Sequence, residues 1–484
     1  MKRVGRLFVI SASMLTALSM TTSCRTIGFK VGLLCLHGQT STYDNNFIHG
    51  FTEACDELGV RLDERDIRSN VAEDANVIAT AATEWADDGY SMIFADSFGH
   101  QYGMIGVAAK YPDTYFCHGT GTLGPVAGVN NFFNAFADIY EGRYLAGVAA
   151  GAKLADDVAN GKYSKNQAII GYVGAWPYAE VISGYTSFFL GARRGAERYN
   201  ALYSPALPLT RDDVKMKVTY TNSWYDYKAE KEAATSLIRN EGCKLISQHA
   251  DSMGAPQACA LYKIPNVTYN IDTYNKTPDT YLYGCKINWK PYFKHIITAA
   301  KQKYYGKDPI TEIIEPDYCE GLNFSHTDWD DPAAGSVAML KKGRMMEGNN
   351  NKINEVVENV TSELEDYVED DGNNPAGFIF NVEDFSVSDK YNYTAFHGDP
   401  TLGIQPYLIA TATTNGTLEE YKPDIYDVDP AYAHDDVNVV LTNAETDTYF
   451  AESAWKNSDF KEQTGKDARS APYFDIIIDG IEIL

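Results

Sequence analysis

The sequence lacks the short motifs that usually mark an enzyme or a metal site. It has no GxSxG, HExxH or P-loop pattern, and its eight cysteines form no CxxC pair and no Cys/His cluster at metal-ligand spacing. Positive charge is also scarce, because 41 Lys and Arg stand against 66 Asp and Glu and leave a formal net charge of −25. Proteins that bind polymeric nucleic acid rely on Lys and Arg against phosphates. We therefore expect no enzymatic activity, no metal and no nucleic-acid partner.

The first apolar stretch is too short to span a bilayer and has the setting of an export signal. Basic residues within the first six positions precede Leu7–Met20, and Ser23 and Cys24 follow. A small residue before a cysteine is typical of bacterial lipid attachment, although Thr21 stands where an aliphatic residue is usual. We expect residues 1–24 to be a signal peptide, with a lipid on Cys24 holding the mature chain at the extracytoplasmic face of the cell membrane. The alternative is an ordinary cleaved leader.

The other seven cysteines are an odd number, which does not suit a complete set of disulfides. Cys35, Cys117 and Cys285 lie in apolar runs that have the pattern of core strands. We expect buried free thiols.

From residue 30 to about 304 the chain alternates between strand and helix patterns. The expected strands are 31–36, 92–95, 115–118, 168–173, 216–220, 244–247, 267–270 and 281–286. The expected helices are 47–58, 75–87, 102–110, 140–155, 180–198, 228–239 and 289–304. This alternation predicts parallel sheets covered by helices on both faces, and a polar interruption at 156–166 divides it into two series. The fold class is therefore α/β with two doubly wound lobes, and such sheets bind ligands at the carboxyl ends of their strands.

After about residue 305 the alternation stops. Residues 353–367 have the pattern of one acidic amphipathic helix, and beyond Phe385 the sequence is rich in Tyr, Asp and Thr. We expect a β-rich or irregular C-terminal extension that closes with an alternating strand at 473–484.

Residues 119–124 match the GxGxxG pattern of dinucleotide-binding proteins. Pro125 follows at once and no helix pattern opens after it, so a pyrophosphate would have no helix N-terminus to bind. We expect no dinucleotide and no other cofactor.

Aromatic residues beside short polar ones follow several expected strands. Tyr43 and Asp44 follow the first strand, Ser97 the next, Tyr185 the first strand of the second series and Trp224 the strand after it. Aromatic faces stack on a flat heterocycle, while carboxylates accept hydrogen bonds from hydroxyl groups. The pattern therefore favours a flat ligand joined to a polyol, bound between the lobes.

Several blocks of sequence resemble the basic-membrane-protein family, the purine-nucleoside-receptor lipoproteins of ABC transporters. The strongest blocks are 30–60, 138–151 (DIYEGRYLAGVAAG) and 170–192, with support from 222–226 and 244–254. The resemblance implies a type I periplasmic-binding-protein fold, with two lobes, three crossovers and a nucleoside trapped by hinge closure. It also implies a membrane permease as the partner.

The resemblance further implies domain limits. Lobe 1 would comprise 28–160 with 268–300, and lobe 2 would comprise 161–267 with 301–325. Residues 326–385 would form the C-terminal segment of the family. Residues 386–484 would be a tail extension without a counterpart in it.

Site roles carry over from the family by position. Tyr43 and Trp224 stand where two Phe residues stack on the purine, and Asp272 and Lys286 match the pair that binds the ribose. Asp44 replaces an Asn and His118 stands near a usual Asp, so these two would read the base. A hydrogen-bond acceptor at Asp44 and a donor at His118 would favour guanosine, then inosine, over adenosine. The alternatives are riboflavin or another flat ligand on the same fold, a sensor, or a surface interaction protein.

Overall fold

The computed structural model describes residues 28–120, 129–177, 179–306, 317–322, 335–371, 375–381, 384–386 and 477–484. The leader with Cys24 and most of the expected C-terminal extension lie outside these residues. The strands are β1 (Val31–Leu34), β2 (Ile67–Arg68), β3 (Met92–Ala95), β4 (Tyr115–Gly119), β5 (Phe132–Ala137), β6 (Ile169–Gly174), β7 (Lys215–Tyr220), β8 (Leu245–His249), β9 (Asn266–Tyr269), β10 (Tyr281–Ile287), β11 (Asp317–Glu320), β12 (Val337–Met339) and β13 (Ile481–Ile483). The α-helices are α1 (Thr42–Glu57), α2 (Ala75–Asp87), α3 (Gln101–Ala108), α4 (Ile139–Ala159), α5 (Ala179–Tyr203), α6 (Tyr227–Arg239), α7 (Gly254–Tyr262), α8 (Lys290–Tyr304), α9 (Lys352–Asp371) and α10 (Pro375–Ile379).

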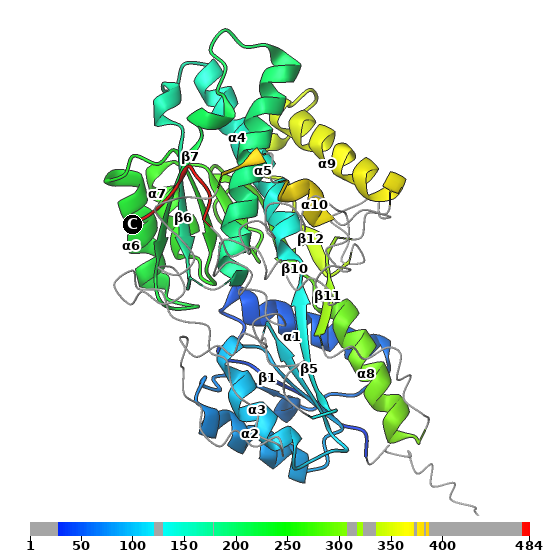
Figure 1. The fold of residues 1–484 in the computed structure, drawn as a ribbon. Coiled ribbons are helices and arrows are strands. Elements are labelled where there is room, and N and C mark those ends of the chain that lie inside the picture. Colours follow the sequence, from blue (N-terminus) through cyan, green and yellow to red (C-terminus); the bar gives the residue numbers. More distant parts are fainter. Residues whose placement is uncertain are drawn as a thin grey trace, which may run out of the picture.

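The strands form two separate sheets, one in each lobe (Figure 1). Lobe 1 has the strand order β11-β5-β4-β3-β1-β2, and lobe 2 has the order β12-β10-β9-β8-β6-β7-β13. The pairings are parallel except for β12, which runs antiparallel to β10. In both sheets the chain starts inside the sheet, at β1 or β6, steps outward once to β2 or β7, and then returns across the sheet, as in doubly wound folds. In lobe 2 the C-terminal β13 is added outside β7. The expected α/β fold of the type I periplasmic-binding kind is confirmed.

Strands β1, β3, β4 and β5 of the lobe 1 sheet are buried on both faces, which explains why these strands are apolar runs. Val31 and Leu33 of β1 belong to the core shared with α1, whereas Leu34 belongs to the core under α2 and α3. The face under α1 also carries α8, where Trp289 stacks on Phe47 with ring centroids 4.2 Å apart.

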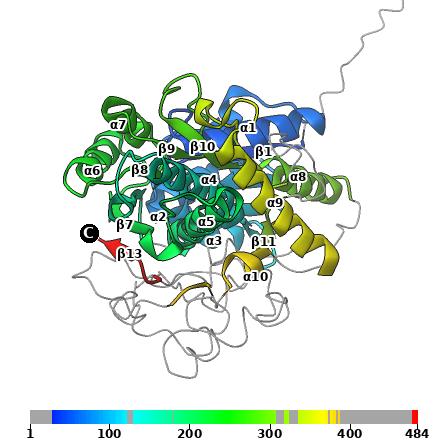
Figure 2. The same cartoon turned by 90° about the horizontal axis from the view of Figure 1, so that it is seen from above.

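Lobe 2 repeats this arrangement with different helices. Val173 and Ile246 pack under α6 and α7, while Ile170 and Tyr172 face the core of α4 and α5. Figure 2 shows α6 and α7 on one side of this sheet and α4, α5 and α9 on the other.

The described chain passes between the two sheets three times. It leaves lobe 1 after β5, returns after β10 and crosses again between β11 and β12. Three expected assignments are corrected by this path: α4 packs on lobe 2, β10 lies in the sheet of lobe 2, and β11 lies in that of lobe 1. The reason is that the crossings occur at the carboxyl ends of strands, where the lobes face each other. The polar segment 156–166 is instead the last turn of α4 and the loop after it, both on lobe 2.

The block DIYEGRYLAGVAAG owes part of its composition to helix packing. A Cβ atom on Gly147 would lie 2.0 Å from the carbonyl oxygen of Phe188, and one on Gly151 would lie 1.8 Å from that of Ala192. On the facing helix, Gly191 and Gly195 approach α4 just as closely. Glycines four residues apart on both helices therefore let α4 and α5 touch backbone to backbone.

The last residues belong to lobe 2 rather than to a separate tail. β13 pairs with β7 in parallel, and Ile477, Ile478 and Ile481 are buried. The amide of Asp479 donates to the carbonyl of Ser386 at 2.8 Å, so the chain returns at 479 to the place it left at 386. The expected closing strand is confirmed at Ile481–Ile483, and the description of 386–484 as an appended tail is corrected for these residues.

Several elements were not predicted, namely β2, β5, β11, β12, α7 and α10. β5 was missed because the Gly- and Pro-rich stretch before it indicated a loop, and α7 because Gly254 and Pro256 open it. Proline is nevertheless tolerated in the first turn of a helix, where its missing N–H has no partner to lose.

The six described cysteines whose pairing is known are all free and buried, as expected for core thiols. Among the described helices, none combines the length and the apolarity that crossing a bilayer requires.

Candidate ligand-binding site

A narrow cavity lies between the lobes, at the carboxyl ends of both sheets. Lobe 1 lines it with Leu36, His37, Tyr43, Asp44, Ser97, Phe98 and Thr120. Lobe 2 lines it with Glu180, Trp224, His249, Asp251 and Tyr269.

The first turn of α1 positions the aromatic and acidic groups of lobe 1. Ser41 caps this helix, because its hydroxyl oxygen accepts a hydrogen bond from the amide of Asp44 at 3.2 Å. The cap fixes the start of the helix next to the end of β1, so Tyr43 and Asp44 both reach the cavity. The hydroxyl of Tyr43 also lies 3.1 Å from Thr120 Oγ1, which ties the ring to the loop after β4.

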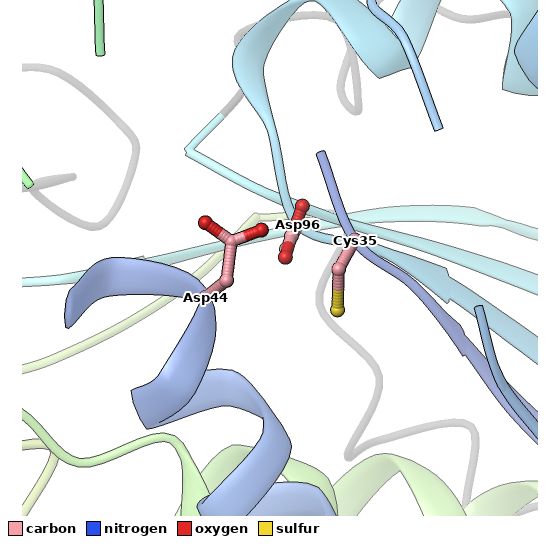
Figure 3. A group of neighbouring side chains, drawn as sticks. All are labelled: Cys35, Asp44 and Asp96. Carbon is pink, nitrogen blue, oxygen red and sulfur yellow. The ribbon is translucent and has the colours of Figure 1, made fainter. Parts of the chain in front are cut away.

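Asp44, which lines the cavity, lies next to two buried groups that do not line it, Asp96 and Cys35 (Figure 3). One side-chain ligand atom of each of the three lies within 4.8 Å of the others. The amide of His37 donates to Asp44 Oδ1 at 2.7 Å, and the amide of Leu36 donates to Asp96 Oδ1 at 2.9 Å. The other oxygen of Asp96 has no hydrogen-bond partner in the described part of the chain.

Burial and the charge of Asp44 raise the pKa of Asp96 well above its usual range. Burial, followed by the two carboxylates, likewise raises the pKa of the Cys35 thiol. The pKa of Asp44 is lowered because hydrogen bonds from His37 and Ser41 outweigh its own burial. A neutral carboxyl and a neutral thiol are poor metal ligands, since metals bind the deprotonated forms. The cluster therefore holds one ionised carboxylate, Asp44, which faces the cavity.

The wall formed by lobe 2 contains Glu180, His249 and Asp251, together called the lobe 2 wall below. Glu180 lies in the first turn of α5, where an acid is favoured by the helix dipole. His249 ends β8, and its Nε2 lies 3.9 Å from Glu180 Oε1. Its ring packs on Tyr269 with centroids 4.1 Å apart.

The loops of lobe 2 are joined at the cavity, and Trp224 is part of this connection. The amide of Asp251 donates to the carbonyl of Trp224 at 3.0 Å. Asp226 caps α6 by accepting a hydrogen bond from the amide of Ala229 at 2.9 Å. The loop that carries Trp224 is thus held at both sides.

The two lobes touch beside the cavity. The amide of Thr42 in lobe 1 donates to the carbonyl of Asp251 in lobe 2 at 2.9 Å. Asn46 Nδ2 donates to Asn270 Oδ1 at 2.9 Å, and the rings of His37 and Tyr225 lie 5.3 Å apart. These contacts describe a closed arrangement of the lobes.

Four of the expected site residues line this cavity: Tyr43, Asp44, Ser97 and Trp224. Tyr43 and Trp224 come from opposite lobes, as expected for two rings on either side of a flat ligand. Their stacking on a ligand stays a prediction.

His118 and Tyr185 are not among the described residues that line the cavity, although both were expected there. His118 is fully buried within β4, with Nε2 2.5 Å from the carbonyl oxygen of Ser97 and Nδ1 3.2 Å from Asn134 Oδ1. Burial lowers the pKa of His118 to about 4, so it stays neutral. Tyr185 lies on the inner face of α5, where it packs edge-on against Tyr172 and its hydroxyl accepts from Tyr220.

Asp272 and Lys286 also lie outside the set of residues that line the cavity. Asp272 is exposed, and its Oδ1 accepts a hydrogen bond from the amide of Tyr274 at 2.6 Å, an Asx-type turn. Lys286 is partly buried in β10. Burial lowers its pKa, and the negative charge of Glu53, which acts to raise the pKa, only partly offsets this effect. The pair therefore does not line the cavity in this arrangement of the lobes, and its role in binding the sugar stays a prediction.

Sequence reasoning missed the lobe 2 wall, Thr120 and Tyr269. The signal for the wall was present in the polar end of an apolar strand, Ser247–Asp251, which follows the same rule that identified Tyr43 and Trp224. Glu180 carried a weaker signal, because an acid in the first turn of a helix is common at any helix start.

Comparison with known proteins gives matches of three kinds. A family model described as "ABC transporter substrate-binding protein PnrA-like" matches residues 40–308. A purine-binding protein of Brucella abortus is 33% identical over 241 residues, which cover 50% of this chain and 59% of that protein. A putative ABC transporter glucose-binding protein of Haloferax volcanii is 30% identical over 210 residues, covering 43% of this chain and 46% of that protein. The match thus spans about half the length of these relatives.

Among solved structures, an ABC transporter solute-binding protein of Aeropyrum pernix K1 is similar, with a TM-score of 0.49 and 16% identity. It matches over 74% of this chain and 93% of that one.

Proposed function

Because this chain belongs to the family of PnrA-like ABC transporter substrate-binding proteins, we propose that it binds a purine nucleoside between its lobes. The observation that carries the proposal is the placement of Tyr43 and Trp224, which line one cavity from opposite lobes. Stacking on two rings contributes roughly 1–3 kcal/mol for each ring. With two charge-assisted hydrogen bonds of roughly 1.5–3 kcal/mol each, the sum reaches the roughly 8 kcal/mol of micromolar binding.

Asp44 supports a base that offers N–H donors. Its carboxylate is ionised and can only accept hydrogen bonds, which suits guanine N1–H and the exocyclic amine of guanine. We therefore favour guanosine, then inosine, over adenosine. His118, which was to read the carbonyl of the base, is buried behind Ser97 and has no part in this proposal.

The name of the Brucella relative supports a purine as the ligand, and that of the Haloferax relative keeps a sugar as the second candidate. Riboflavin, which joins a flat ring system to a polyol, fits the same combination of aromatic and acidic residues. Both alternatives share the expectation of a polyhydroxyl group.

We further propose that the mature protein works on the extracytoplasmic side of the membrane, anchored through a lipid on Cys24, and delivers its ligand to an ABC permease. The residues 2–24 support an export signal. One acyl chain binds membranes only marginally, so stable attachment requires the several chains of a bacterial lipoprotein.

Mass spectrometry of the ligand that co-purifies with the natively isolated chain tests the proposal. A purine nucleoside in stoichiometric amount is the expected result, and a thermal-shift panel of guanosine, inosine, adenosine, riboflavin and glucose ranks the alternatives. A shift with riboflavin or glucose alone would overturn the nucleoside proposal.

A further inference from the structure

Two side chains of the lobe 2 wall, His249 and Asp251, are buried at the cavity without hydrogen-bond partners among the described residues, and the half-buried Glu180 lies beside them. Asp251 is only 4% exposed, and in the described part of the chain its carboxyl group makes no hydrogen bond. Neither ring nitrogen of His249 has a hydrogen-bond partner among the described residues. Glu180 approaches only His249, at the 3.9 Å already given.

Such groups are uncommon in folded proteins. A buried polar group that is left unsatisfied costs roughly 1–3 kcal/mol, so most of them are paired with protein or water. Two at one wall of one cavity, with Glu180 beside them, indicate that a bound molecule supplies the missing partners. That molecule must present polar groups on the side of lobe 2, next to Trp224.

Asp251 and His249 are both held in their neutral forms, which suits a neutral polar ligand group. Burial, and then the charges of Glu230, Asp44 and Glu180, raise the pKa of Asp251 well above its usual range. Burial lowers the pKa of His249, so its neutral form is favoured. A protonated Asp251 and a neutral His249 each offer a donor and an acceptor. A phosphate would meet the negative charge of Asp44 without any described Lys or Arg among the residues that line the cavity.

A hydroxyl group also donates and accepts, and it therefore matches a wall of this kind. We propose that Glu180, His249 and Asp251 form a polyol subsite that binds vicinal hydroxyls of the ligand's sugar, while the flat part of the ligand lies between Tyr43 and Trp224. For a nucleoside this inference rests on the proposed function. It gives the recognition of the ribose to residues other than Asp272 and Lys286.

Calorimetric titration of the full-length chain with guanosine, 2′-deoxyguanosine, guanine and free ribose or glucose tests the subsite. The variants are Asp251→Asn and Glu180→Gln, with Asp272→Asn as the matched control on an exposed carboxylate of the same lobe. Each wall variant should weaken guanosine binding by about 5- to 150-fold, the effect of losing one hydrogen bond to a buried group. Guanine binding should not change, and its retention shows that the variant is folded. The wild-type chain should prefer guanosine to 2′-deoxyguanosine, and Asp272→Asn should keep this preference.

Two results would overturn the polyol subsite and leave purine binding intact: equal affinity of the wild type for guanosine and guanine, or an equal loss of both ligands in the wall variants. If instead no purine ligand binds, but a free sugar does and loses affinity in Asp251→Asn, the subsite stands and the nucleoside proposal falls. Absence of binding by every ligand of the panel would overturn both.

Discussion

Asp96 lies directly behind Asp44, and of the two carboxyl groups only that of Asp44 lines the cavity. Each receives a backbone N–H from the loop after β1, Asp44 from His37 and Asp96 from Leu36. The pKa of Asp96 is raised and that of Asp44 is lowered, so the pair contains one proton and one charge. This arrangement presents a carboxylate to the ligand while its neighbour stays neutral.

Asp96→Asn should increase the free energy of unfolding more at pH 8 than at pH 4.5. The raised pKa of Asp96 means that the folded chain keeps a proton which the unfolded chain loses above its ordinary pKa of about 3.9. Its contribution to stability is therefore complete below that pH and is lost as the pH rises through the folded pKa. An amide has no such proton to lose. Urea unfolding of both proteins at the two pH values measures the difference.

Asp96→Leu is the control, because it removes the acceptor of the Leu36 amide and should destabilise the chain by about 1–3 kcal/mol at either pH. A loss of stability in Asp96→Asn that is the same at pH 4.5 and pH 8 would show that Asp96 is ionised.

Trp224→Ala should weaken ligand binding by about 1–3 kcal/mol, or about 5- to 150-fold, through the loss of stacking. Calorimetry with the ligand that co-purifies measures the change. Tyr227→Ala, which removes an exposed aromatic ring of the same lobe outside the cavity, should bind normally. Unchanged affinity in a folded Trp224→Ala would rule out stacking by this residue.

Gly151→Ala should destabilise the chain by about 1–3 kcal/mol or more, because the added Cβ would collide with the backbone of α5. Gly106→Ala in α3 is the matched change, since a Cβ there meets nothing within 4 Å. Alanine in a helix is favoured over glycine by roughly 0.5–1 kcal/mol, so this variant should be slightly more stable. Thermal unfolding that shows the same effect for both glycines would contradict the close contact of α4 and α5.

Cys24→Ser should release the protein from the membrane fraction, because serine provides no thiol for the lipid. Cell fractionation followed by immunodetection measures the distribution, and Cys35→Ser, a change at a buried cysteine of lobe 1, is the control. If Cys24→Ser remains membrane-bound to the same extent as the wild type, the anchor lies elsewhere.

The sequence was sufficient for the lobes because buried parallel strands and amphipathic helices have strong periodic patterns. It was also sufficient for Tyr43, Asp44, Ser97 and Trp224, since a residue directly after a parallel strand lies at the edge where ligands bind. The rule fails for a residue inside a strand, and His118 is one residue before the end of β4.

The positions of Asp272 and Lys286, the pair expected to bind the sugar, could not be predicted from the rule that residues after parallel strands line the site. Asp272 was assigned by its position in a family motif, and in the structure it is an exposed residue that does not line the cavity. The side of α5 on which Tyr185 lies depends on its contacts with the sheet below, and no local pattern reports them. Nor could the path of the chain be predicted, because α4 follows a strand of lobe 1 but packs on lobe 2.

The hydrogen bond between Asp479 and Ser386 has a consequence for how the protein matures. The sheet of lobe 2 cannot acquire its edge strand until residues 477–484 have left the ribosome and, if the chain is exported, crossed the membrane. Ser386 and Asp479 lie side by side although more than ninety positions separate them, and the entropic cost of bringing the two ends of such a segment together grows only with the logarithm of its length. Relatives could therefore lengthen or shorten this segment almost freely, whereas deletion of the final strand would leave an open edge on lobe 2 beside β7.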